Sequence, residues 1–470
     1  MLYTLYKSVD NTVKHRTFTR HEELSTSRSS VDYSKTRMRI INNSMEINKG
    51  DFDAFVSNII NEKGDLSNSF KELAKMVSSS NFISDEFEIL PGLIDKFIYF
   101  LNFGSECPFT LDILSILLNL WYISKFNPVL TNEALITTVF EYCKCSNLDF
   151  AKTALCSIAN ISTYIPTLVF SLMNDDFIEF LHSNIYKDSP NGKIDPILRI
   201  ILTFCRIEQK NEILPHFFTF IPNFINSFFH KSSFIMVFVS EILFHMITTV
   251  DNAYTFSIEN GLLNQIELTL KFCDPTRLKF IFRIISICLE HPDERPKFAT
   301  IEFLQRIKDR LLMQYCSEDA FYLCNIIQIL IPEMWQQIYE IGMIHKMIEI
   351  SDKVEFHNKE YYAVCFNSFI MHATEEIRNE VLRPDENGEN SIFIYFCNIV
   401  ATISDFHYLF HLLETIERII LSDEYYVQLA LNENLIDSLE AIDQSDEKIS
   451  SLAQRIINLL IDYQRNHECQ

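Results

Sequence analysis

The sequence predicts an all-α solenoid of helical repeats, and three observations support this fold class. Only 8 of the 470 residues are glycine, whereas an α/β enzyme needs many for its phosphate loops and strand–helix turns. Polar residues near helix ends recur at a nearly constant spacing. Segments such as "IENGLLNQIELTL" and "YEIGMIHKMIEI" combine a turn containing Gly or Asn with an apolar helix, as a helix–helix junction requires. Stacked units of this kind bury one continuous core and leave an extended concave surface.

A basic arm over residues 1–44 precedes the predicted solenoid, which covers residues 45–470. Residues 1–39 contain eight Lys and Arg against four Asp and Glu, whereas the whole chain has a formal net charge of −23. A basic tail on an acidic body is typical of an interaction segment, and we expect this arm to be flexible. The arm has no apolar signal-peptide core, so we expect the protein in the cytoplasm and nucleus.

The recurring polar residues define the repeat. Asn119 in "LDILSILLNLWYIS" and Asn160 in "KTALCSIANIS" are 41 residues apart, and Asn325 and Asn367 are 42 apart. The same period passes through Thr203, His245 and Ile287. This period lies in the range of armadillo and HEAT repeats, which have two or three helices per unit. We therefore expect about ten armadillo repeats in a right-handed superhelical solenoid, with the asparagines along its concave surface.

The apolar stretch from Ile213 to Ile247 resembles a membrane segment at first. It is interrupted before about 20 apolar residues accumulate, by Pro215, Pro222, His230, Lys231, Glu241 and His245. We therefore expect buried helices here and no membrane insertion. The acidic composition also argues against direct nucleic-acid binding, where a basic surface is expected. Later in the chain, "LRPDENGENS" is typical of a surface loop, and it widens the spacing between late repeats.

Catalytic and metal-binding chemistry has little support in the sequence. His407, His411 and Glu414 in "FHYLFHLLE" place two histidines four residues apart, a spacing that can share a metal, but no H-E-x-x-H motif is present. Cys143 and Cys145 in "EYCKC" have no thioredoxin-like context. Helix packing explains both better. We expect reduced, mostly buried thiols and a non-enzymatic protein without a cofactor or a metal.

Four stretches of the chain, taken in order, carry a family resemblance. "ILPGLIDKFIYFLNFGSECPFTLDILSILLNLWYIS" and "AKTALCSIANIS" resemble the first two full groove repeats of importin alpha, the adaptor family that carries nuclear-localisation-signal cargo. "ILTFCR" resembles a later element, and "LALNENLIDSLEAIDQSDEKISSLAQRIINLLIDY" resembles the closing repeat. The order is kept from about residue 50 to the end.

The resemblance implies a set of groove residues. In importin alpha each rung pairs an Asn with a Trp four residues earlier on the same helix face. The Asn carboxamide clamps an extended peptide backbone, and the Trp faces hold lysine side chains. Asn119 and Asn160 match rungs of the family's major site, and Asn325 and Asn367 match rungs of its minor site. The Trp positions are occupied by Ser115, Cys156, Arg199 (with Thr203 as its rung), Phe321 and Ala363.

The minor-site half is therefore the better preserved groove. Phe321 retains an aromatic wall before Asn325, and Glu360 retains an acid near Asn367. In the other half, the positive charge of Arg199 would repel a basic peptide.

The resemblance implies a non-catalytic nuclear import adaptor with two kinds of partner. The acidic groove would bind basic cargo peptides, and the arm would bind an importin-beta-type receptor and compete with cargo for the groove. The arm residues implied are Lys14, Arg16, Arg20, Arg28, Lys35, Arg37 and Arg39. The alternative is an armadillo-repeat scaffold whose remodelled groove binds another protein, because the Trp ladder is missing.

Overall fold

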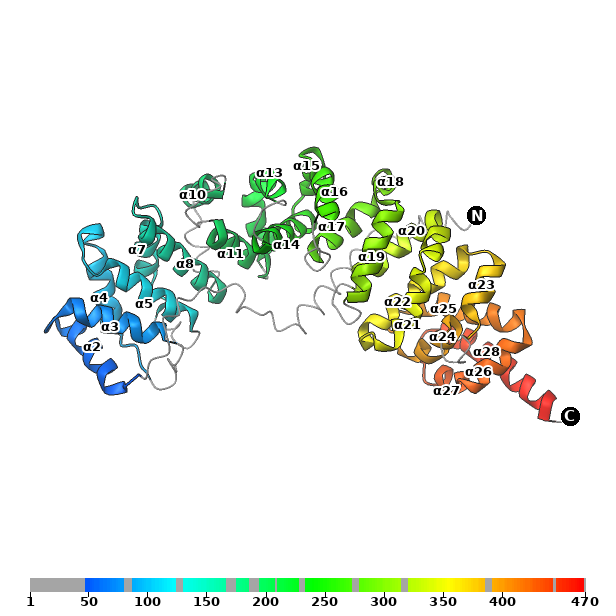
Figure 1. Ribbon diagram of the computed structural model, residues 1–470. Helices are drawn as coiled ribbons and strands as arrows, with labels where there is room; N and C mark the ends of the chain where they lie inside the picture. The colour runs from blue at the N-terminus through cyan, green and yellow to red at the C-terminus, as the bar shows by residue number, and fades with distance from the viewer. Residues whose placement is uncertain are drawn as a thin grey trace. The chain divides into compact units, whose positions relative to one another are not determined.

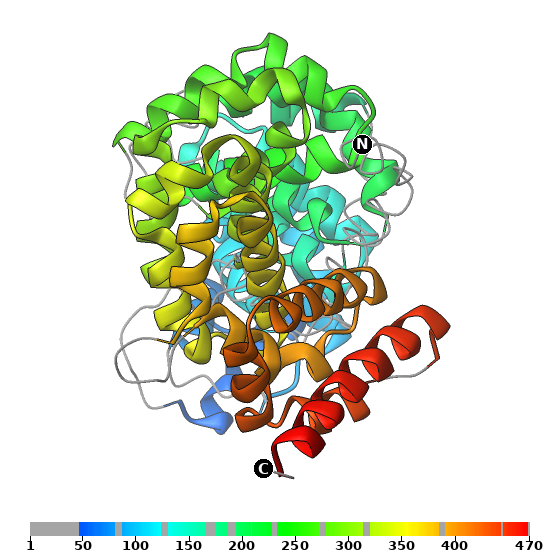
Figure 2. The ribbon, with the colours of Figure 1, turned by 90° about the vertical axis from the view of Figure 1, so that its right-hand side faces the viewer.

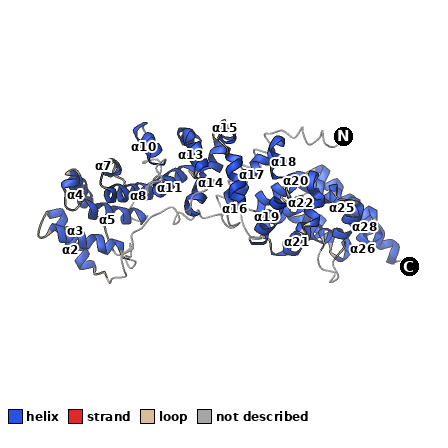
Figure 3. Cartoon of the chain, turned by 45° about the horizontal axis from the view of Figure 1, so that its top comes forward, coloured by secondary structure: helices blue, strands red, loops and turns tan. Residues whose placement is uncertain are grey.

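The computed structural model describes most of the chain as helices. The described residues are 47–79, 87–123, 130–165, 175–185, 194–207, 209–227, 233–272, 279–313, 320–384, 391–442 and 445–468. The arm residues predicted to bind a receptor, Lys14 to Arg39, lie outside this range. No strand occurs in these stretches (Figure 3). The chain divides after Ile266 into two compact units, unit 1 and unit 2, each of which is described by itself.

Unit 1 is a stack of helices in two layers. Its elements are α2 (Lys49–Asn61), α3 (Leu66–Ser78), α4 (Pro91–Leu101), the 3-10 helix η5 (Gly104–Glu106), α5 (Thr110–Tyr122), α7 (Glu133–Cys143), α8 (Leu148–Tyr164), α10 (Asp175–Ile185), α11 (Ile194–Cys205), α12 (Lys210–Ile213), η7 (Leu214–Phe220), α13 (Ile221–Asn226), α14 (Ser233–Thr249) and α15 (Ala253–Glu259). The boundary between the units falls within α16 (Leu262–Phe272).

A central row of helices forms the core of unit 1. Helices α3, α5, α8, α11 and α14 each pack against the next, and Figure 1 shows α4, α7, α10 and α13 as the other layer. The sequence of α5 explains its central place, because nine of its 13 residues are buried, including Trp121. Helices in this row contact neighbouring helices on both sides. They therefore need apolar residues on more than one face to bury these contacts.

Unit 2 repeats a triad of two shorter helices followed by a longer one. Its elements are α17 (Lys279–Glu290), η9 (Pro292–Glu294), α18 (Arg295–Phe298), α19 (Ile301–Met313), α20 (Ala320–Glu340), α21 (Met343–Ile350), η10 (Ser351–Lys353), α22 (Phe356–His372), α23 (Glu375–Leu382), α24 (Ile392–Ile399), η11 (Val400–Thr402), α25 (Phe406–Ser422), α26 (Glu424–Asn432), α27 (Leu435–Glu440) and α28 (Glu447–Glu468). The triads α18–α19–α20, α23–α24–α25 and α26–α27–α28 follow this order.

The long helices of unit 2 form its central row. Helices α17, α20, α22, α25 and α28 pack in succession, and Figure 2 shows the red α28 beside the orange α25. Helix α20 is two helices joined at a kink, where Pro332 precedes the non-helical backbone of Met334. Proline removes one helical hydrogen bond and so favours a kink here. The second part of α20 serves as the short helix before α21 and α22.

Buried polar side chains connect one repeat to the next. The Asn160 amide of α8 donates to the Leu118 carbonyl of α5 at 2.9 Å. The Tyr142 hydroxyl of α7 donates to the Leu101 carbonyl of α4 at 2.6 Å. The paired residues are 42 and 41 positions apart, which is the repeat period. Each bond satisfies a polar group that would otherwise be costly to bury.

The predicted all-α solenoid is confirmed in each unit. The apolar stretch 213–247 forms the buried segments η7, α13 and α14 with short helix α12 before them. Among the described residues, no helix combines the length and the apolar character needed to cross a membrane. The loop expected at 382–391 connects α23 to α24, although residues 385–390 lie outside the described range. The number of repeats and the superhelical hand stay predictions.

Candidate peptide-binding surfaces

The two asparagines predicted for the major site lie on the central row of unit 1. Asn119 of α5 and Asn160 of α8 are both buried. Asn119 donates to the carbonyl of Ser115 in its own helix at 2.9 Å, and Asn160 donates to Leu118 of the neighbouring helix. The Asn160 amide therefore already connects two helices of the stack, whereas the Asn119 amide bonds within α5. Their role as peptide clamps stays a prediction.

Two positions of unit 1 that the resemblance matches to tryptophan hold a buried cysteine and a paired arginine. Burial raises the pKa of the Cys156 thiol to about 12, so this cysteine is not a nucleophile at neutral pH. The Arg199 guanidinium pairs with Asp195 at 3.1 Å and lies 4.9 Å from the ring centre of Phe238. This carboxylate one turn away reduces the repulsion expected between Arg199 and a basic peptide, which stays a prediction.

An aromatic pair marks the minor-site half in unit 2. Phe321 of α20 meets Tyr361 of α22 edge to face, with ring centres 4.8 Å apart, and both rings are partly exposed. One turn after Phe321, the amide of Asn325 donates to the hydroxyl of Ser286 on α17 at 2.7 Å. The asparagine thus braces the row, while the aromatic pair lies between two neighbouring long helices.

An acidic pair lies on the other side of α22. Glu360 accepts a hydrogen bond from Ser404 at 3.3 Å, next to Asp405. Burial, together with the negative charge of Asp405, raises the pKa of Glu360 above its ordinary value. No cation among the described residues contributes to this pKa. The folded surroundings therefore disfavour the ionised form of Glu360 relative to water, and hydrogen bonds from Ser404 and Asp405 offset part of this effect.

Helix α22 contacts α20 on one face and α25 on another. Tyr361 and Cys365, one turn apart, point toward α20, since Cys365 also donates to the Cys324 carbonyl at 3.0 Å. Glu360 and Asn367, seven residues apart, point toward α25, where Asn367 accepts from the Thr415 hydroxyl. The structure therefore brings Phe321 to Tyr361, and Glu360 to Asp405.

Two partners in unit 2 were missed from the sequence. Tyr361 follows the predicted Glu360 directly, but only the packing of α20 on α22 places it against Phe321. Arg283 of α17 lies 4.7 Å from the ring centres of Phe280 and Tyr322. Phe280 and Arg283 are three residues apart, so a helix brings them to the same face. This spacing could have indicated their contact from the sequence.

The raised pKa of Glu360 predicts a pH-dependent stability. Folded Glu360 binds its proton at a higher pH than the unfolded chain does, so its contribution to stability grows as the pH falls through the folded pKa. Glu360→Gln removes the ionised form. We expect the variant to melt at a higher temperature than wild type at pH 7.5 and the difference to vanish below the ordinary value of 4.5. Calorimetric melts across this range test it, and a constant difference at every pH would contradict it.

The other candidates for chemistry have ordinary surroundings. His407 and His411 have ring centres 4.6 Å apart, and the Nδ1 of His411 lies 3.1 Å from Glu414. Burial and the neighbouring His411 lower the pKa of His407. In the part of the chain that the structure describes, no group of three His, Cys, Asp or Glu side chains is arranged to hold a metal.

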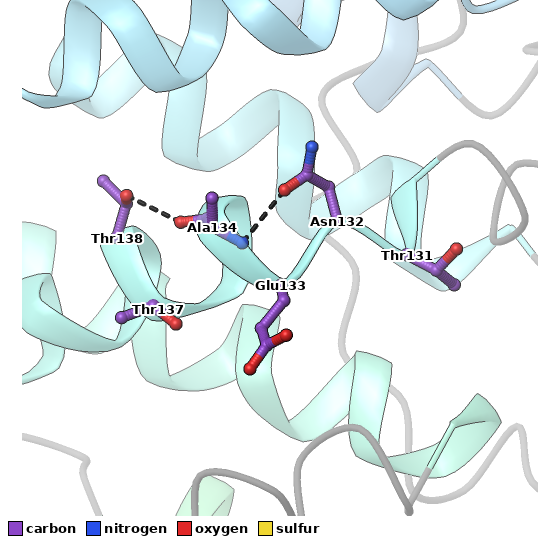
Figure 4. Close-up of a pocket in the computed structure, with 6 residues that line it drawn as sticks. All are labelled: Thr131, Asn132, Glu133, Ala134, Thr137 and Thr138. Atoms are coloured by element: carbon purple, nitrogen blue, oxygen red, sulfur yellow. Dashed lines mark hydrogen bonds between the residues drawn. The ribbon is translucent and has the colours of Figure 1, made fainter.

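Side chains that line a shallow depression at the start of α7 make hydrogen bonds within that helix and its N-cap (Figure 4). It has a volume of about 910 Å³ and is lined by Thr131, Asn132, Glu133, Ala134, Thr137 and Thr138. Asn132 accepts from the backbone N–H of Ala134 at 2.9 Å, and Thr138 donates to the Ala134 carbonyl at 2.7 Å. These bonds complete the helix end. The depression holds no pair of a nucleophile and a base.

Comparison with solved structures identifies the class of fold. The chain is an all-α solenoid, and it is similar to the crystal structure of an engineered protein with a TM-score of 0.63 at 12% identity, over 88% of this chain and 99% of that one. It is also similar to a computationally designed armadillo repeat protein for modular peptide recognition (TM-score 0.42, 14% identity, 50% of this chain and 98% of that one).

A third similar structure is a designed armadillo repeat protein in complex with the peptide (KR)4, with a TM-score of 0.41 at 13% identity, over 50% of this chain and 98% of that one. No family model and no curated protein matches the chain. At these identities the likeness concerns the fold, and the function has to be argued from the surfaces themselves.

Proposed function

We propose that the protein is a non-catalytic adaptor that binds extended basic peptide segments along the long helices of unit 2. The observation that carries this proposal is that α22 has the aromatic pair Phe321–Tyr361 on its α20 side and the acidic pair Glu360–Asp405 on its α25 side. Aromatic faces attract a lysine or arginine side chain, and a carboxylate without a cationic neighbour gains from its charge. Both pairs involve α22, so one peptide running across α20, α22 and α25 reaches each of them.

The finer proposal is nuclear import, as the resemblance to importin alpha implies. The arm at residues 1–44 would bind an importin-beta-type receptor, and cargo would present a basic localisation signal to the groove. The net charge of −23 supports attraction of basic segments. The protein would then act in the cytoplasm and the nucleus.

A remodelled scaffold is the second candidate, and one feature of unit 1 favours it. The positions at which the family has tryptophans hold the buried Cys156 and the paired Arg199. Neither side chain can form a wall for a lysine. If unit 1 lacks such pockets, a long basic signal would contact fewer sites than in importin alpha, and another protein would fit this surface better.

The test of the proposal is peptide binding by the full chain. Fluorescein-labelled (KR)4 is titrated at two salt concentrations and followed by fluorescence anisotropy. We expect salt-weakened binding that falls about tenfold in Phe321→Ala and in Glu360→Gln, because each removes one side of a cation site. The matched control is Glu141→Gln, a mostly exposed acid on α7, which should bind as wild type does.

Two results separate the candidates. If (KR)4 does not bind, or binds equally to all variants, the basic-peptide proposal is wrong and the scaffold is favoured. The arm is tested in the full chain by replacing Lys14, Arg16, Arg20, Arg28, Lys35, Arg37 and Arg39 with glutamine. Loss of capture by an importin-beta-type receptor, with peptide binding retained, would support the import role.

A further inference from the structure

One corner of unit 1 exposes aromatic side chains next to each other. Tyr99 and Phe103, one turn apart at the end of α4, are 47% and 55% exposed, and their ring centres lie 5.1 Å apart. Single exposed apolar residues are common on protein surfaces, but adjacent large ones mark interaction sites more often. Lys96 lies over the Tyr99 ring at 5.3 Å and also pairs with Glu62.

A hollow opens beside these rings. It has a volume of about 310 Å³ and is lined by Phe100, Phe103, Glu106, Cys107, Pro108 and Phe109. The buried or partly buried Phe100, Cys107 and Phe109 form its apolar base, whereas Phe103, Glu106 and Pro108 are exposed at its rim. A volume at the lower end of the range for ligand sites fits one bulky side chain better than a cofactor.

The base of the hollow belongs to a packed aromatic cluster. Phe109 stacks on Phe70 at 4.9 Å between ring centres and meets Phe100 edge to face at 5.5 Å. Phe70 and Phe100 also meet edge to face, at 5.4 Å. The hollow therefore ends on a fixed wall of the core, and a further aromatic ring entering it would extend this edge-to-face arrangement.

The loop that presents the rim is held in place. The buried Thr110 hydroxyl lies 3.1 Å from the carbonyl of Gly104 and 3.0 Å from that of Cys107, so it joins both ends of η5. Gly104 has a φ of +68°, a conformation that directs the chain outward after Phe103. A preorganised rim loses little conformational freedom when a partner binds.

The charged residues near this corner indicate the charge of the partner. Residues 87–123 contain a single lysine, Lys96, against Glu88, Asp95, Glu106 and Asp112. Lys96 is already paired with Glu62, whereas exposed Glu106 lines the hollow itself. A positive side chain beside the bound residue would meet Glu106 and the negative field of the chain.

We propose that this corner, formed by α4, η5 and the start of α5, is a second docking surface. It accepts a partner segment that inserts one aromatic side chain into the hollow and places a Lys or Arg next to Glu106. Tyr99 and Phe103 cover the side of the inserted ring. This surface belongs to unit 1, whereas the proposed groove belongs to unit 2, so the two proposals rest on different residues.

The test uses three fluorescein-labelled peptides with the full chain, Gly-Ser-Lys-Trp-Lys-Ser-Gly and its Lys-Ala-Lys and Glu-Trp-Glu counterparts. We expect the Lys-Trp-Lys peptide to bind at least about tenfold more tightly than either counterpart. Phe103→Ala and Glu106→Gln should each weaken it about tenfold. Phe103 is exposed, so its replacement leaves the fold intact, which circular dichroism verifies.

Controls distinguish this surface from the groove and from self-association. Leu148→Ala, at an apolar residue 49% exposed elsewhere in unit 1, should leave Lys-Trp-Lys binding unchanged. Equal binding of all three peptides, loss of binding only in Glu360→Gln, or no binding at millimolar concentration would overturn the proposal. The other possible occupant is a second copy of this chain, which sedimentation velocity detects as a dimer. A dimer that Phe103→Ala abolishes would assign the surface to that second copy instead.

Discussion

Trp121→Ala is expected to destabilise the described part of unit 1 by about 3–5 kcal/mol. Trp121 lies on α5 and is fully buried, and α5 packs between α3 and α8. Removing the indole leaves a cavity in the central row, which neighbouring helices on both sides hold open. Hydrogen exchange of the α5 and α8 amides measures the local free energy of opening, and protection should fall by that amount in these helices.

Trp121→Phe is the matched control. The indole Nε1 has no hydrogen-bond partner among the described residues, so tryptophan already leaves one polar group unsatisfied. Phenylalanine removes that group and keeps most of the apolar volume, and we expect a loss of less than about 1.5 kcal/mol. An equal loss in both variants would show that the indole N–H has an important bond after all.

Periodicity made the fold predictable, because every repeat has to bury the same faces. The spacing from Asn119 to Asn160 located two successive helices of the central row, and "YEIGMIHKMIEI" predicted the turn before α21. The sequence could not indicate that α20 consists of two helical segments joined by a kink near Pro332. A proline is compatible with a helix end as well as a kink, and packing on both sides decides between them.

The candidate site was predictable only in part, because side-chain direction depends on neighbouring helices. Phe321 and Glu360 were predicted from the family resemblance, whereas Tyr361 and Asp405 became visible only through the packing of α22 between α20 and α25. Asn160 shows the opposite case. Its recurrence at the repeat spacing suggested a peptide clamp, whereas in the structure its amide donates a hydrogen bond to the preceding repeat. A clamp and a bond between repeats would both recur once per repeat, so the sequence alone does not distinguish them.

Arg206→Met is expected to destabilise unit 1 by about 3–5 kcal/mol, because it leaves a buried carboxylate without its counter-charge. The Arg206 guanidinium contacts Glu241 of α14 at 2.6 Å, and the Glu241 side chain is only 8% exposed. This bond joins the end of α11 to α14, two adjacent helices of the central row. Urea unfolding followed by circular dichroism, together with hydrogen exchange in α11 and α14, measures the loss.

The double variant Arg206→Met/Glu241→Leu decides how the loss arises. Replacing both charges with apolar side chains removes the desolvation cost along with the attraction, so most of the stability should return. If the double variant is as unstable as Arg206→Met, the bond itself stabilises the stack. The pair also bears on the proposed function, because Glu241 lies four residues before His245, through which the repeat period passes. Arg206 neutralises Glu241 and so weakens its attraction for a basic peptide, which agrees with the proposal that peptides bind in unit 2.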